Sequence, residues 1–334
     1  MIPPATDMPA PLRIGSVQLD GRVFLAPMSG VTDVGMRRIA RRFGASLVVS
    51  EMVACDDYVK GDAEHRLRAE GEGVTPHCVQ IAGCDPYWMG EAARLAEASG
   101  AHIVDINMGC PAKRVTGGVA GSALMREPDL ALDLIRATVA AVRIPVTVKM
   151  RLGWDHASIN APELARRAQA EGAALITVHG RTRQQFYKGR ADWAAVRAVR
   201  EATTLPLVVN GDGASLACAR AMLAQSGADA VMIGRAAVGR PWLVGEIARA
   251  LAGLPAAPVS DEDKAMAVLE HYDSLLETFG AAQGLRHARK HVAAYSEWAG
   301  ASAAERARLV TSDDPNVVRA GLSSLFLAKD QAAA

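Results

Sequence analysis

Aromatic residues and net charge are both low in this sequence. Phe, Trp and Tyr make up 4% of the 334 residues, whereas half of all residues are hydrophobic. The core must therefore be built from Val, Ile, Leu, Ala and Met, and the length allows a barrel of about 250 residues with a smaller second domain. Because the formal net charge is only +1, any surface that binds nucleic acid must be a local basic patch.

Cysteine pairs and long apolar runs are missing as well. The five cysteines, at positions 55, 78, 84, 110 and 218, show no C-x-x-C spacing, so we expect reduced thiols in a cytosol and neither a disulfide framework nor a metal site. No apolar run reaches the roughly 18 residues that a membrane span needs, and the proline-rich first eleven residues do not resemble a signal peptide. These absences predict a cytoplasmic protein without a membrane segment.

Eight short apolar segments recur in the first 235 residues. They cover residues 23–26, 46–49, 77–81, 103–106, 146–150, 175–178, 207–209 and 230–233. Their short length and nearly continuous apolar character are typical of strands that are buried on both faces. Segments with helical spacing lie between them, for example residues 89–98 and 128–142. Eight strands that alternate with helices predict an α/β fold, a (β/α)8 TIM barrel over residues 12–250.

The alternative fold is an open, doubly wound sheet, but no G-x-G-x-x-G motif follows the first predicted strand. The pattern changes after the barrel. Residues 253–258 form a linker-like stretch, and residues 260–263 resemble a capping box at the start of a helix. Apolar residues then recur at helical spacing without a strand-like segment. We therefore expect a small all-helical C-terminal domain over residues 260–330.

Polar or glycine residues follow every predicted strand. In chain order these are Pro27, Met28 and Ser29; Ser50 and Glu51; Gln80; Asn107; Lys149 and Arg151; His179 and Arg181; Asn210, Gly211 and Asp212; and Gly234 and Arg235. The carboxyl-terminal ends of the strands form the active site in this type of barrel. Because all eight strand ends contribute, we interpret this rim as a functional site.

The last two strand ends have the composition of a phosphate site. Gly211, Gly213 and Gly234 allow backbone N–H groups to approach an anion closely, and the loops after strands seven and eight frequently bind phosphate in TIM barrels. Arg235 adds a positive charge next to Gly234. Ordinary tight turns would also explain the glycines, but the arginine favours phosphate binding.

Lys149 directly follows an apolar segment and is therefore expected close to the barrel interior. An ammonium there needs an anionic partner, because burying an unpaired charge is costly. One interpretation is a Schiff-base lysine, as in an aldolase. The other is a cation beside the ring of a reduced flavin, to which Gln80 and His179 on neighbouring strands would add hydrogen bonds.

Cys110 lies in a segment, residues 109–121, that is rich in glycine and contains Lys113 and Arg114. A loop of this composition suits a lid that carries an active-site thiol over a substrate. The alternative is a small buried hydrophobic residue, which is our interpretation of the other four cysteines. The polar setting of Cys110 favours the active-site thiol.

Nine blocks of the sequence, spread over nearly the whole chain, match one known family. They are LAPMSGVTD at 25–33, NMGCPAK at 107–113, GSALM at 121–125, VKMRLGW at 148–154, VHGRTR at 178–183, NGD at 210–212, IGR at 233–235, GRPW at 239–242 and RKH at 289–291. Together they resemble the tRNA-dihydrouridine synthases, in particular the bacterial B-type subgroup. The block around Cys110 is the most specific of them.

The resemblance implies a function and its ligands. In this family tightly bound FMN, with NADPH as co-substrate, reduces the C5=C6 bond of a specific uridine in tRNA to 5,6-dihydrouridine, and the resemblance makes Cys110 the catalytic acid. The residues implied to bind FMN are Pro27, Met28, Ser29, Gln80, Lys149, His179, Asn210, Gly211, Asp212, Gly234 and Arg235. Those implied to bind the substrate are Asn107 and Arg151 at the flipped base and Arg289, Lys290 and His291 on the tRNA. Arg181 is expected to contact the tRNA as part of the basic cluster after the sixth predicted strand.

Basic residues gather in three places. One cluster follows the sixth predicted strand at residues 181–190, where Tyr187 offers a ring for stacking, and one lies at residues 286–291. We interpret the second of these as an RNA contact because it matches the family. The four arginines at 37, 38, 41 and 42 are interpreted as the solvated face of the first helix.

We expect a monomer whose partners are tRNA and NADPH, without membrane association. The alternative function is an FMN barrel that acts on a free pyrimidine or on dihydroorotate. A non-enzymatic alternative is an RNA-binding module on an inactive barrel, and the combination of Lys149, His179 and Cys110 argues against it.

Overall fold

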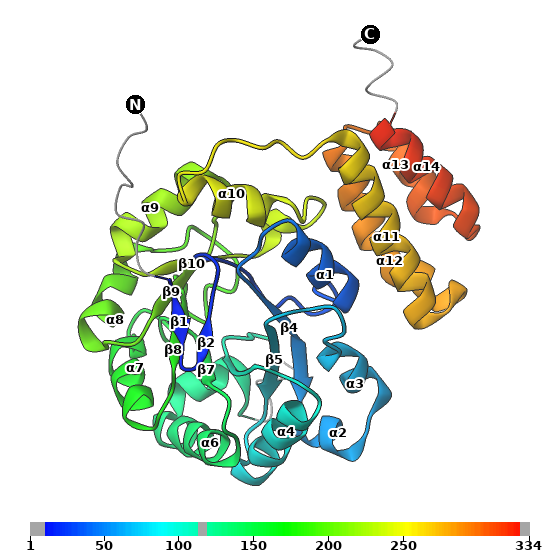
Figure 1. The fold of residues 1–334 in the computed structure, drawn as a ribbon. Helices are drawn as coiled ribbons and strands as arrows, with labels where there is room; N and C mark the ends of the chain where they lie inside the picture. Colours follow the sequence, from blue (N-terminus) through cyan, green and yellow to red (C-terminus); the bar gives the residue numbers. More distant parts are fainter. Residues whose placement is uncertain (1–10, 113–118, 328–334) are drawn as a thin grey trace.

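The computed structural model describes residues 11–112 and 119–327 and shows a closed barrel of eight parallel strands (Figure 1). Their bounds are β3 Val23–Leu25, β4 Leu47–Ala54, β5 His77–Ala82, β6 Ile103–Met108, β7 Val146–Arg151, β8 Leu175–His179, β9 Leu207–Asn210 and β10 Ala230–Ile233. All eight predicted strands are present, and β10 pairs with β3 to close the sheet. The predicted barrel is thus confirmed. Lys113 and Arg114, in the segment after Cys110, lie outside the described residues, as do residues 328–330.

Helices connect the strands and surround the barrel (Figure 1). They are α1 Val34–Arg42, α2 Cys55–Lys60, α3 Ala63–Ala69, α4 Pro86–Ala98, α6 Pro128–Ala141, α7 Ala161–Ala170, α8 Arg197–Ala202, α9 Leu216–Ser226 and α10 Leu243–Leu251, with short 3-10 helices η1 Gly121–Arg126, η2 Ala194–Val196 and η3 Arg235–Ala237. Outward side chains of the strands, such as Val48, Ile106 and Ile176, pack with these helices into one continuous apolar core. Burial on both faces explains why the strands read as unbroken apolar segments.

Inward side chains change from apolar to polar along the strands. Phe24 and Ile103 belong to an apolar layer that packs against Ile14, in a hairpin formed by β1 Arg13–Ile14 and β2 Val17–Gln18. Sequence analysis missed this hairpin because two-residue strands show no periodicity. Inward positions recur every second residue, and near the carboxyl-terminal strand ends they are polar: Gln80, Asp105, Asn107, Thr147, Lys149, Thr177, His179 and Asn210. The barrel interior is therefore apolar at the amino-terminal ends of the strands and polar at their carboxyl-terminal ends.

Strand β4 continues to Ala54, beyond the predicted segment, and its pairing with β5 shifts register at a β-bulge between Val49 and Met52. Ser50 and Glu51, which sequence analysis placed beyond the strand, lie within this bulge. The Ser50 hydroxyl accepts a hydrogen bond from the Gln80 N–H at 2.9 Å and donates one to the Glu51 carbonyl at 2.8 Å. A bulge changes the direction of side chains, and Met52 lines the cavity described below.

A small helical domain follows the barrel, as predicted. Its helices are α11 Asp261–Phe279, α12 Ala281–Trp298, α13 Ala303–Thr311 and α14 Pro315–Leu327. Ser260 caps α11 by accepting a hydrogen bond from the Asp263 N–H at 3.0 Å. The ring of Trp242 meets those of Trp298 and Phe326 edge to face, with centroids 4.9 and 6.3 Å apart. Several of the scarce aromatic residues thus pack together where the two domains join. No helix among the described residues is long and apolar enough to cross a membrane.

The first helix does not present all four of its arginines to solvent. Arg37 is fully buried, and its guanidinium donates hydrogen bonds to the carbonyls of Thr32 and Glu70 at 3.0 and 2.5 Å. Arg42, by contrast, is exposed and pairs with Glu270 at 2.5 Å. The interpretation of this cluster as a solvated face is therefore wrong for Arg37, because backbone carbonyls replace water around its charge.

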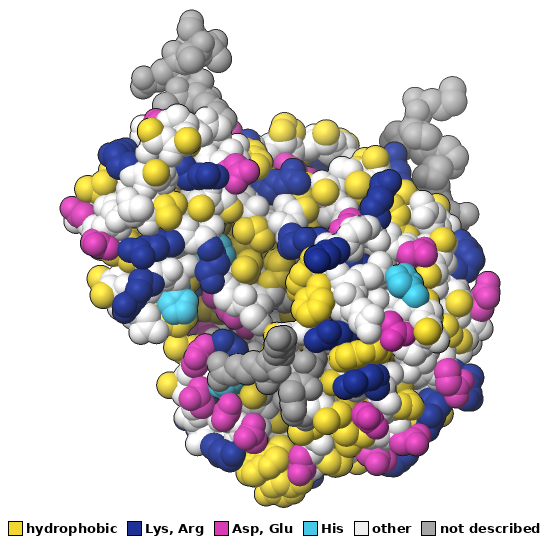
Figure 2. All heavy atoms as spheres, turned by 180° about the vertical axis from the view of Figure 1, so that it is seen from behind, with side chains coloured by type: hydrophobic (Ala, Val, Ile, Leu, Met, Phe, Trp, Pro, Cys, Tyr) yellow, Lys and Arg dark blue, Asp and Glu magenta, His cyan; other side chains and the backbone are white. Residues whose placement is uncertain are grey.

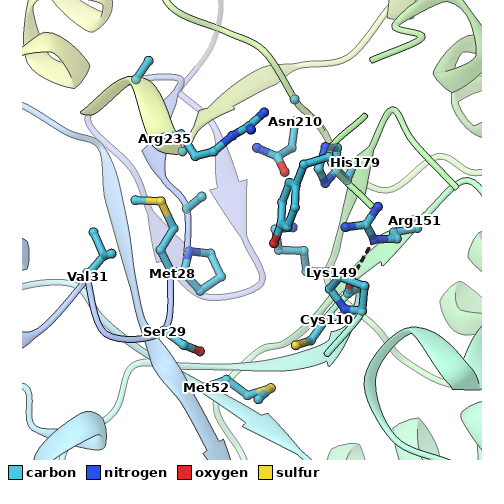
Figure 3. Close-up of a pocket in the computed structure, with 18 of the residues that line it drawn as sticks. Met28, Ser29, Val31, Met52, Cys110, Lys149, Arg151, His179, Asn210 and Arg235 are labelled. Atoms are coloured by element: carbon cyan, nitrogen blue, oxygen red, sulfur yellow. Dashed lines mark hydrogen bonds between the residues drawn. The ribbon is translucent and has the colours of Figure 1, made fainter. Parts of the chain in front are cut away.

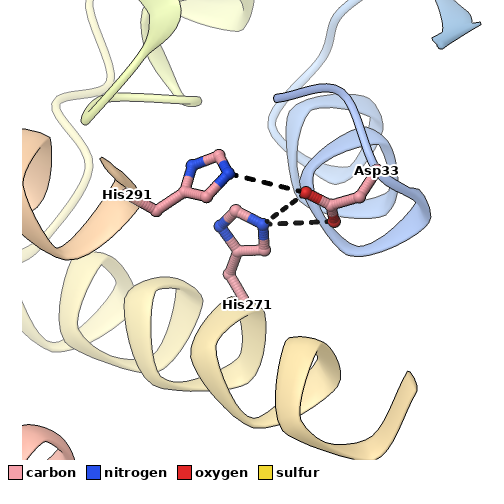
Figure 4. A group of neighbouring side chains, drawn as sticks. All are labelled: Asp33, His271 and His291. Carbon is pink, nitrogen blue, oxygen red and sulfur yellow. Dashed lines mark hydrogen bonds and ion pairs between the residues drawn. The ribbon is translucent and has the colours of Figure 1, made fainter. Parts of the chain in front are cut away.

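Asp33 connects the barrel to the helical domain (Figure 4). Its carboxylate caps α1 by accepting a hydrogen bond from the Met36 N–H at 3.0 Å. It also contacts Nε2 of His271 at 3.1 and 3.2 Å and Nε2 of His291 at 3.7 Å. Burial alone would raise the pKa of Asp33, but His271 and then His291 outweigh it and hold the pKa well below its usual range. The three groups lie close enough to hold a metal ion, yet these contacts already satisfy the carboxylate.

Replacement of Asp33 by Asn should lower the free energy of unfolding by about 2 kcal/mol, because a largely buried carboxylate that hydrogen-bonds His271 loses its charge, and a hydrogen bond to a charged group contributes about 1.5–3 kcal/mol. The amide can still cap α1, so the loss would come from the contacts with His271 and His291. Asp85→Asn is the matched control, since exposed Asp85 caps α4 through the N–H groups of its first turn, and we expect it to cost less than about 0.5 kcal/mol. Urea unfolding measures both variants, and equal losses would contradict the role of Asp33 at the domain junction.

Candidate functional site

A cavity of about 930 Å³ opens at the carboxyl-terminal ends of the barrel strands. This volume lies in the upper part of the range for ligand sites, roughly 300–1,000 Å³. The residues that sequence analysis assigned to the cofactor all line it: Pro27, Met28, Ser29, Gln80, Lys149, His179, Asn210, Gly211, Asp212, Gly234 and Arg235. Cys110, Asn107 and Arg151 line it too. The closed barrel thus brings residues from all eight strand ends into one site.

The cavity has two facing walls (Figure 3). Met28 and Ser29, from the loop after β3, form one side, and Cys110, Lys149 and His179 lie on the other with open space between them. One wall is thus largely apolar, and the other carries a thiol, an ammonium and an imidazole. Such a slot suits a flat ligand that presents polar edges to one side.

The Lys149 ammonium makes no hydrogen bond or ion pair within the described part of the chain. Burial lowers its pKa to about 8, the charge of Arg151 acts in the same direction, and Asp105 and Cys110 act against it. The group is therefore mostly protonated at pH 7. A cation that lines a cavity without a partner predicts an anionic or electron-rich ligand.

Arg181 fixes the protonation of His179. Its Nη1 lies 3.2 Å from Nε2 of His179, and a guanidinium only donates hydrogen bonds, so Nε2 must accept. Burial, followed by the charge of Lys149, lowers the pKa of His179 well below its usual value. The imidazole is therefore neutral with its proton on Nδ1. A side chain at Gly211 would lie 2.9 Å from the ring of His179, which explains the glycine at this position.

Asp212 connects two arginines at the end of the cavity formed by β9 and β10. Its carboxylate accepts hydrogen bonds from Arg181 at 2.6 Å and from Arg235 at 3.2 Å. Arg181 is only 1% exposed and does not line the cavity, so its expected contact with substrate is corrected. Its guanidinium donates hydrogen bonds to His179 and Asp212 instead. The side chain of Arg235 stays 61% exposed and remains available to an anion.

The backbone is fixed on both sides of the Cys110 thiol. The N–H of Cys110 donates to Oδ1 of Asn107 at 2.9 Å, and its carbonyl accepts from the N–H and hydroxyl of Ser122 at 3.0 and 2.8 Å. Arg151 Nε donates to the Gly109 carbonyl at 2.7 Å (Figure 3). These hydrogen bonds hold the thiol at the cavity wall.

Aromatic and basic side chains form the rim of the cavity. Phe186 and Tyr187, in the loop after β8, are 36% and 53% exposed and line the opening. The guanidinium of Arg183 lies 4.6 Å from the Phe186 ring centre, and that of Arg235 lies 5.1 Å from the Tyr187 ring centre. Figure 2 shows further Lys and Arg side chains around the hollow of this face. Such a rim can stack planar groups and attract phosphates.

The C-terminal basic cluster is only partly accessible. Arg289 and Lys290 are exposed on α12, and Arg289 pairs with Asp313 at 3.1 Å. His291 is 2% exposed and contacts Asp33. The expected contact of His291 with tRNA is therefore corrected, because its ring is enclosed at the domain junction. None of these three basic residues lines the cavity.

Sequence analysis missed several residues of the site. Met52 reaches the cavity from the bulge in β4, and Val238 and Arg240 reach it from the segment after η3. No local pattern marks these positions. Asp105, directly below the cavity, did carry a signal, because a carboxylate inside an apolar strand needs buried partners.

The chain is similar to proteins of one family over most of its length. The family model described as dihydrouridine synthase matches residues 24–324. A probable tRNA-dihydrouridine synthase of Rhizobium leguminosarum bv. phaseoli is 57% identical over 303 residues, which cover 90% of this chain and 94% of the relative. A tRNA-dihydrouridine synthase B of Shewanella oneidensis is 44% identical, covering 85% of this chain and 89% of the relative.

Solved structures share the fold at low sequence identity. An old yellow enzyme homologue from Zymomonas mobilis superposes with a TM-score of 0.52 at 16% identity, covering 77% of this chain and 96% of that one. A 2-naphthoyl-CoA reductase gives 0.56 at 12% identity, covering 74% and 52%. These likenesses show the barrel fold alone. The family model and the sequence relatives, in agreement with the sequence blocks, show that the chain belongs to the dihydrouridine synthase family.

Proposed function

We propose that this protein reduces the C5=C6 bond of a specific uridine in tRNA to 5,6-dihydrouridine, with tightly bound FMN and with NADPH as the reductant. The observation that carries the proposal is an ammonium without a partner, Lys149, beside a thiol, Cys110, in one cavity. The names of the relatives support it, since both are tRNA-dihydrouridine synthases. A monomer in the cytoplasm, where tRNA is found, is part of the proposal.

The residues of the cavity fit FMN. Lys149 offers a cation to the electron-rich edge of the flavin ring, and neutral His179 offers an N–H donor. At the other end, a Cβ added to Gly234 would meet no atom closer than 3.7 Å, so a phosphate can approach its backbone. Arg235 lies beside it with an exposed guanidinium. The family to which the chain belongs argues against a Schiff-base lysine, because its relatives are named as tRNA-dihydrouridine synthases and not as aldolases.

The chemistry of the protein follows from this placement. When bound, FMN supplies a hydride for C6 of the uracil. The protein must then deliver a proton to C5, and the Cys110 thiol is the acid that lines the cavity. Lys149 stabilises negative charge at the flavin edge. Asn107 and Arg151 line the same wall, and we assign them to the uracil base.

The target uridine must leave its stack in the tRNA to enter the cavity, at a cost of a few kcal/mol. Phe186 and Tyr187 on the rim offer rings for stacking, and exposed Arg289 and Lys290 on α12 offer charge for phosphates. A barrel that acts on a free pyrimidine or on dihydroorotate would use neither the rim nor the helical domain. We therefore favour tRNA as the substrate.

Replacement of Cys110 by Ala should lower the rate of dihydrouridine formation by at least about 100-fold, since a positioned acid contributes about 10²–10⁴. FMN content and flavin reduction by NADPH should stay close to wild type, because neither step needs the proton donor. The matched control is Cys84→Ala, which removes a thiol that does not line the cavity and that is exposed, so that its interpretation as a buried residue is wrong. Mass spectrometry of the modified tRNA measures the product, and normal product formation by the Cys110 variant would refute its role as acid.

Replacement of Lys149 by Gln should make the midpoint potential of the bound flavin more negative by about 30–60 mV, since about 30 mV corresponds to 1.4 kcal/mol for two electrons. The reason is the loss of a cation that stabilises the reduced, negatively charged ring. Lys60→Gln, which removes an exposed lysine paired with Asp56, is the control. An unchanged potential in the Lys149 variant would show that the ammonium does not lie beside the ring.

A further inference from the structure

A hydrogen-bonded series of buried side chains runs along the floor and wall of the cavity, from β7 to β6, on to β5 and back to β6. The Thr147 hydroxyl donates to Oδ1 of Asp105 at 2.6 Å, and Nε2 of Gln80 donates to Oδ2 of Asp105 at 2.7 Å. Asn107 Nδ2 donates to Oε1 of Gln80 at 2.7 Å. All four side chains belong to residues that are at most 8% exposed. The strand register places Gln80, Asp105 and Thr147 directly side by side.

This hydrogen-bonded series ends at the loop that carries the Cys110 thiol. Oδ1 of Asn107 accepts hydrogen bonds from the N–H groups of Gly109 and Cys110 at 3.1 and 2.9 Å. A single amide oxygen therefore fixes two consecutive peptide groups at the start of this loop. Any rotation of the Asn107 side chain would release both of them.

The direction of every hydrogen bond is fixed from both ends. The backbone N–H groups of Gly109 and Cys110 only donate, so Asn107 must face them with its oxygen and Gln80 with its NH2 group. Gln80 must then accept with its oxygen and donate with its own NH2 group. Only an acceptor can lie beyond it, and that acceptor is Asp105. The pKa of Asp105 is raised to about 6, because burial outweighs the hydrogen bonds from Gln80 and Thr147 and the charge of Lys149, which all lower it. The carboxylate is therefore mostly ionised at neutral pH.

We propose that Asp105 is a positioning residue for the proton transfer. It fixes the amide of Gln80, and through Gln80 the amide of Asn107, so that the Cys110 thiol is held at one place on the cavity wall. Asp105 itself does not line the cavity. The inference rests on the proposed function, because it takes Cys110 as the acid. A shift of the acid by about 1 Å is enough to lower the rate by roughly 100-fold.

A purely structural role of Asp105 makes a different prediction. If the carboxylate only stabilised the barrel, its loss would lower stability, flavin binding and catalysis together. If it served only as a counter-charge for Lys149, its loss would change the flavin potential. The positioning role predicts a change in the proton transfer and in the Cys110 loop, without a matching change in flavin reduction.

The first test compares Asp105→Leu with Asp105→Asn and Thr147→Val. Asp105→Leu removes the acceptor, so kcat for dihydrouridine formation should fall at least about 30-fold, while KM for tRNA and flavin reduction by NADPH change less than about threefold. Asp105→Asn should retain activity within about fivefold, because its amide oxygen can accept from Gln80 while its NH2 group donates to Thr147. Thr147→Val removes the other hydrogen bond to Asp105 and should stay within about threefold.

A double-mutant cycle tests whether Asp105 acts through Asn107. In an Asn107→Ala background, Asp105→Leu should reduce kcat by no more than about twofold, because the hydrogen-bonded series is already broken. A further loss as large as in the wild-type background would overturn the proposal.

Hydrogen exchange gives a readout that needs no substrate. The peptide containing Gly109 and Cys110 should exchange at least about tenfold faster in Asp105→Leu than in the wild-type holoenzyme, and close to wild type in Asp105→Asn. If Asp105→Leu does not fold, Asp105→Val, a smaller side chain that likewise offers no acceptor, replaces it. If the wild-type protein forms no dihydrouridine, the proposed function fails. Hydrogen exchange still tests whether Asp105 fixes the Cys110 loop through Gln80 and Asn107. Unchanged exchange in the variant without an acceptor would overturn the positioning role.

Discussion

A closed barrel separates its interior from bulk water, so every polar side chain that points inward must find a partner inside the protein or in a ligand. The inward polar side chains near the carboxyl-terminal strand ends illustrate this requirement. Asp105 is satisfied by Thr147 and Gln80. The Lys149 ammonium, by contrast, has no hydrogen-bond or ion-pair partner within the described residues. Hydrogen bonds within the barrel thus hold Asp105 in place, whereas the Lys149 ammonium remains available to the ligand that we propose.

Buried arginines hold the loops of the site together. Arg151 is 1% exposed and donates to the carbonyls of Gly109 and Thr182 at 2.7 and 2.8 Å, which connects the Cys110 loop to the loop after β8. Arg181 connects His179 to Asp212 in a similar way. A guanidinium suits this task because its five donors can satisfy several carbonyl or carboxylate groups at once. In the sequence, the charge of Arg181 is easily mistaken for a nucleic-acid contact.

The wall of the cavity and the anchor of the helical domain belong to one short segment. Met28 and Ser29 line the cavity, and Asp33, four residues beyond Ser29, contacts both His271 and His291 of the helical domain. Within this segment the Gly30 N–H donates a hydrogen bond to the buried carboxylate of Glu51. The surface that we assign to tRNA is therefore fixed relative to the flavin pocket by a few buried polar contacts.

The sequence by itself determined the barrel, the helical domain and the residues around the cavity. It could do so because strands buried on both faces read as continuous apolar segments, and because the end of each such segment lies on one rim of a barrel. Tertiary structure alone decided which charges are exposed. Arg181 and His291 look like substrate contacts in the sequence, but Asp212 and Asp33, 31 and 258 residues away, enclose them. The bulge that brings Met52 into the cavity and the partners of Asp105 were likewise not visible, because burial and hydrogen bonding depend on neighbours from other strands and not on local pattern.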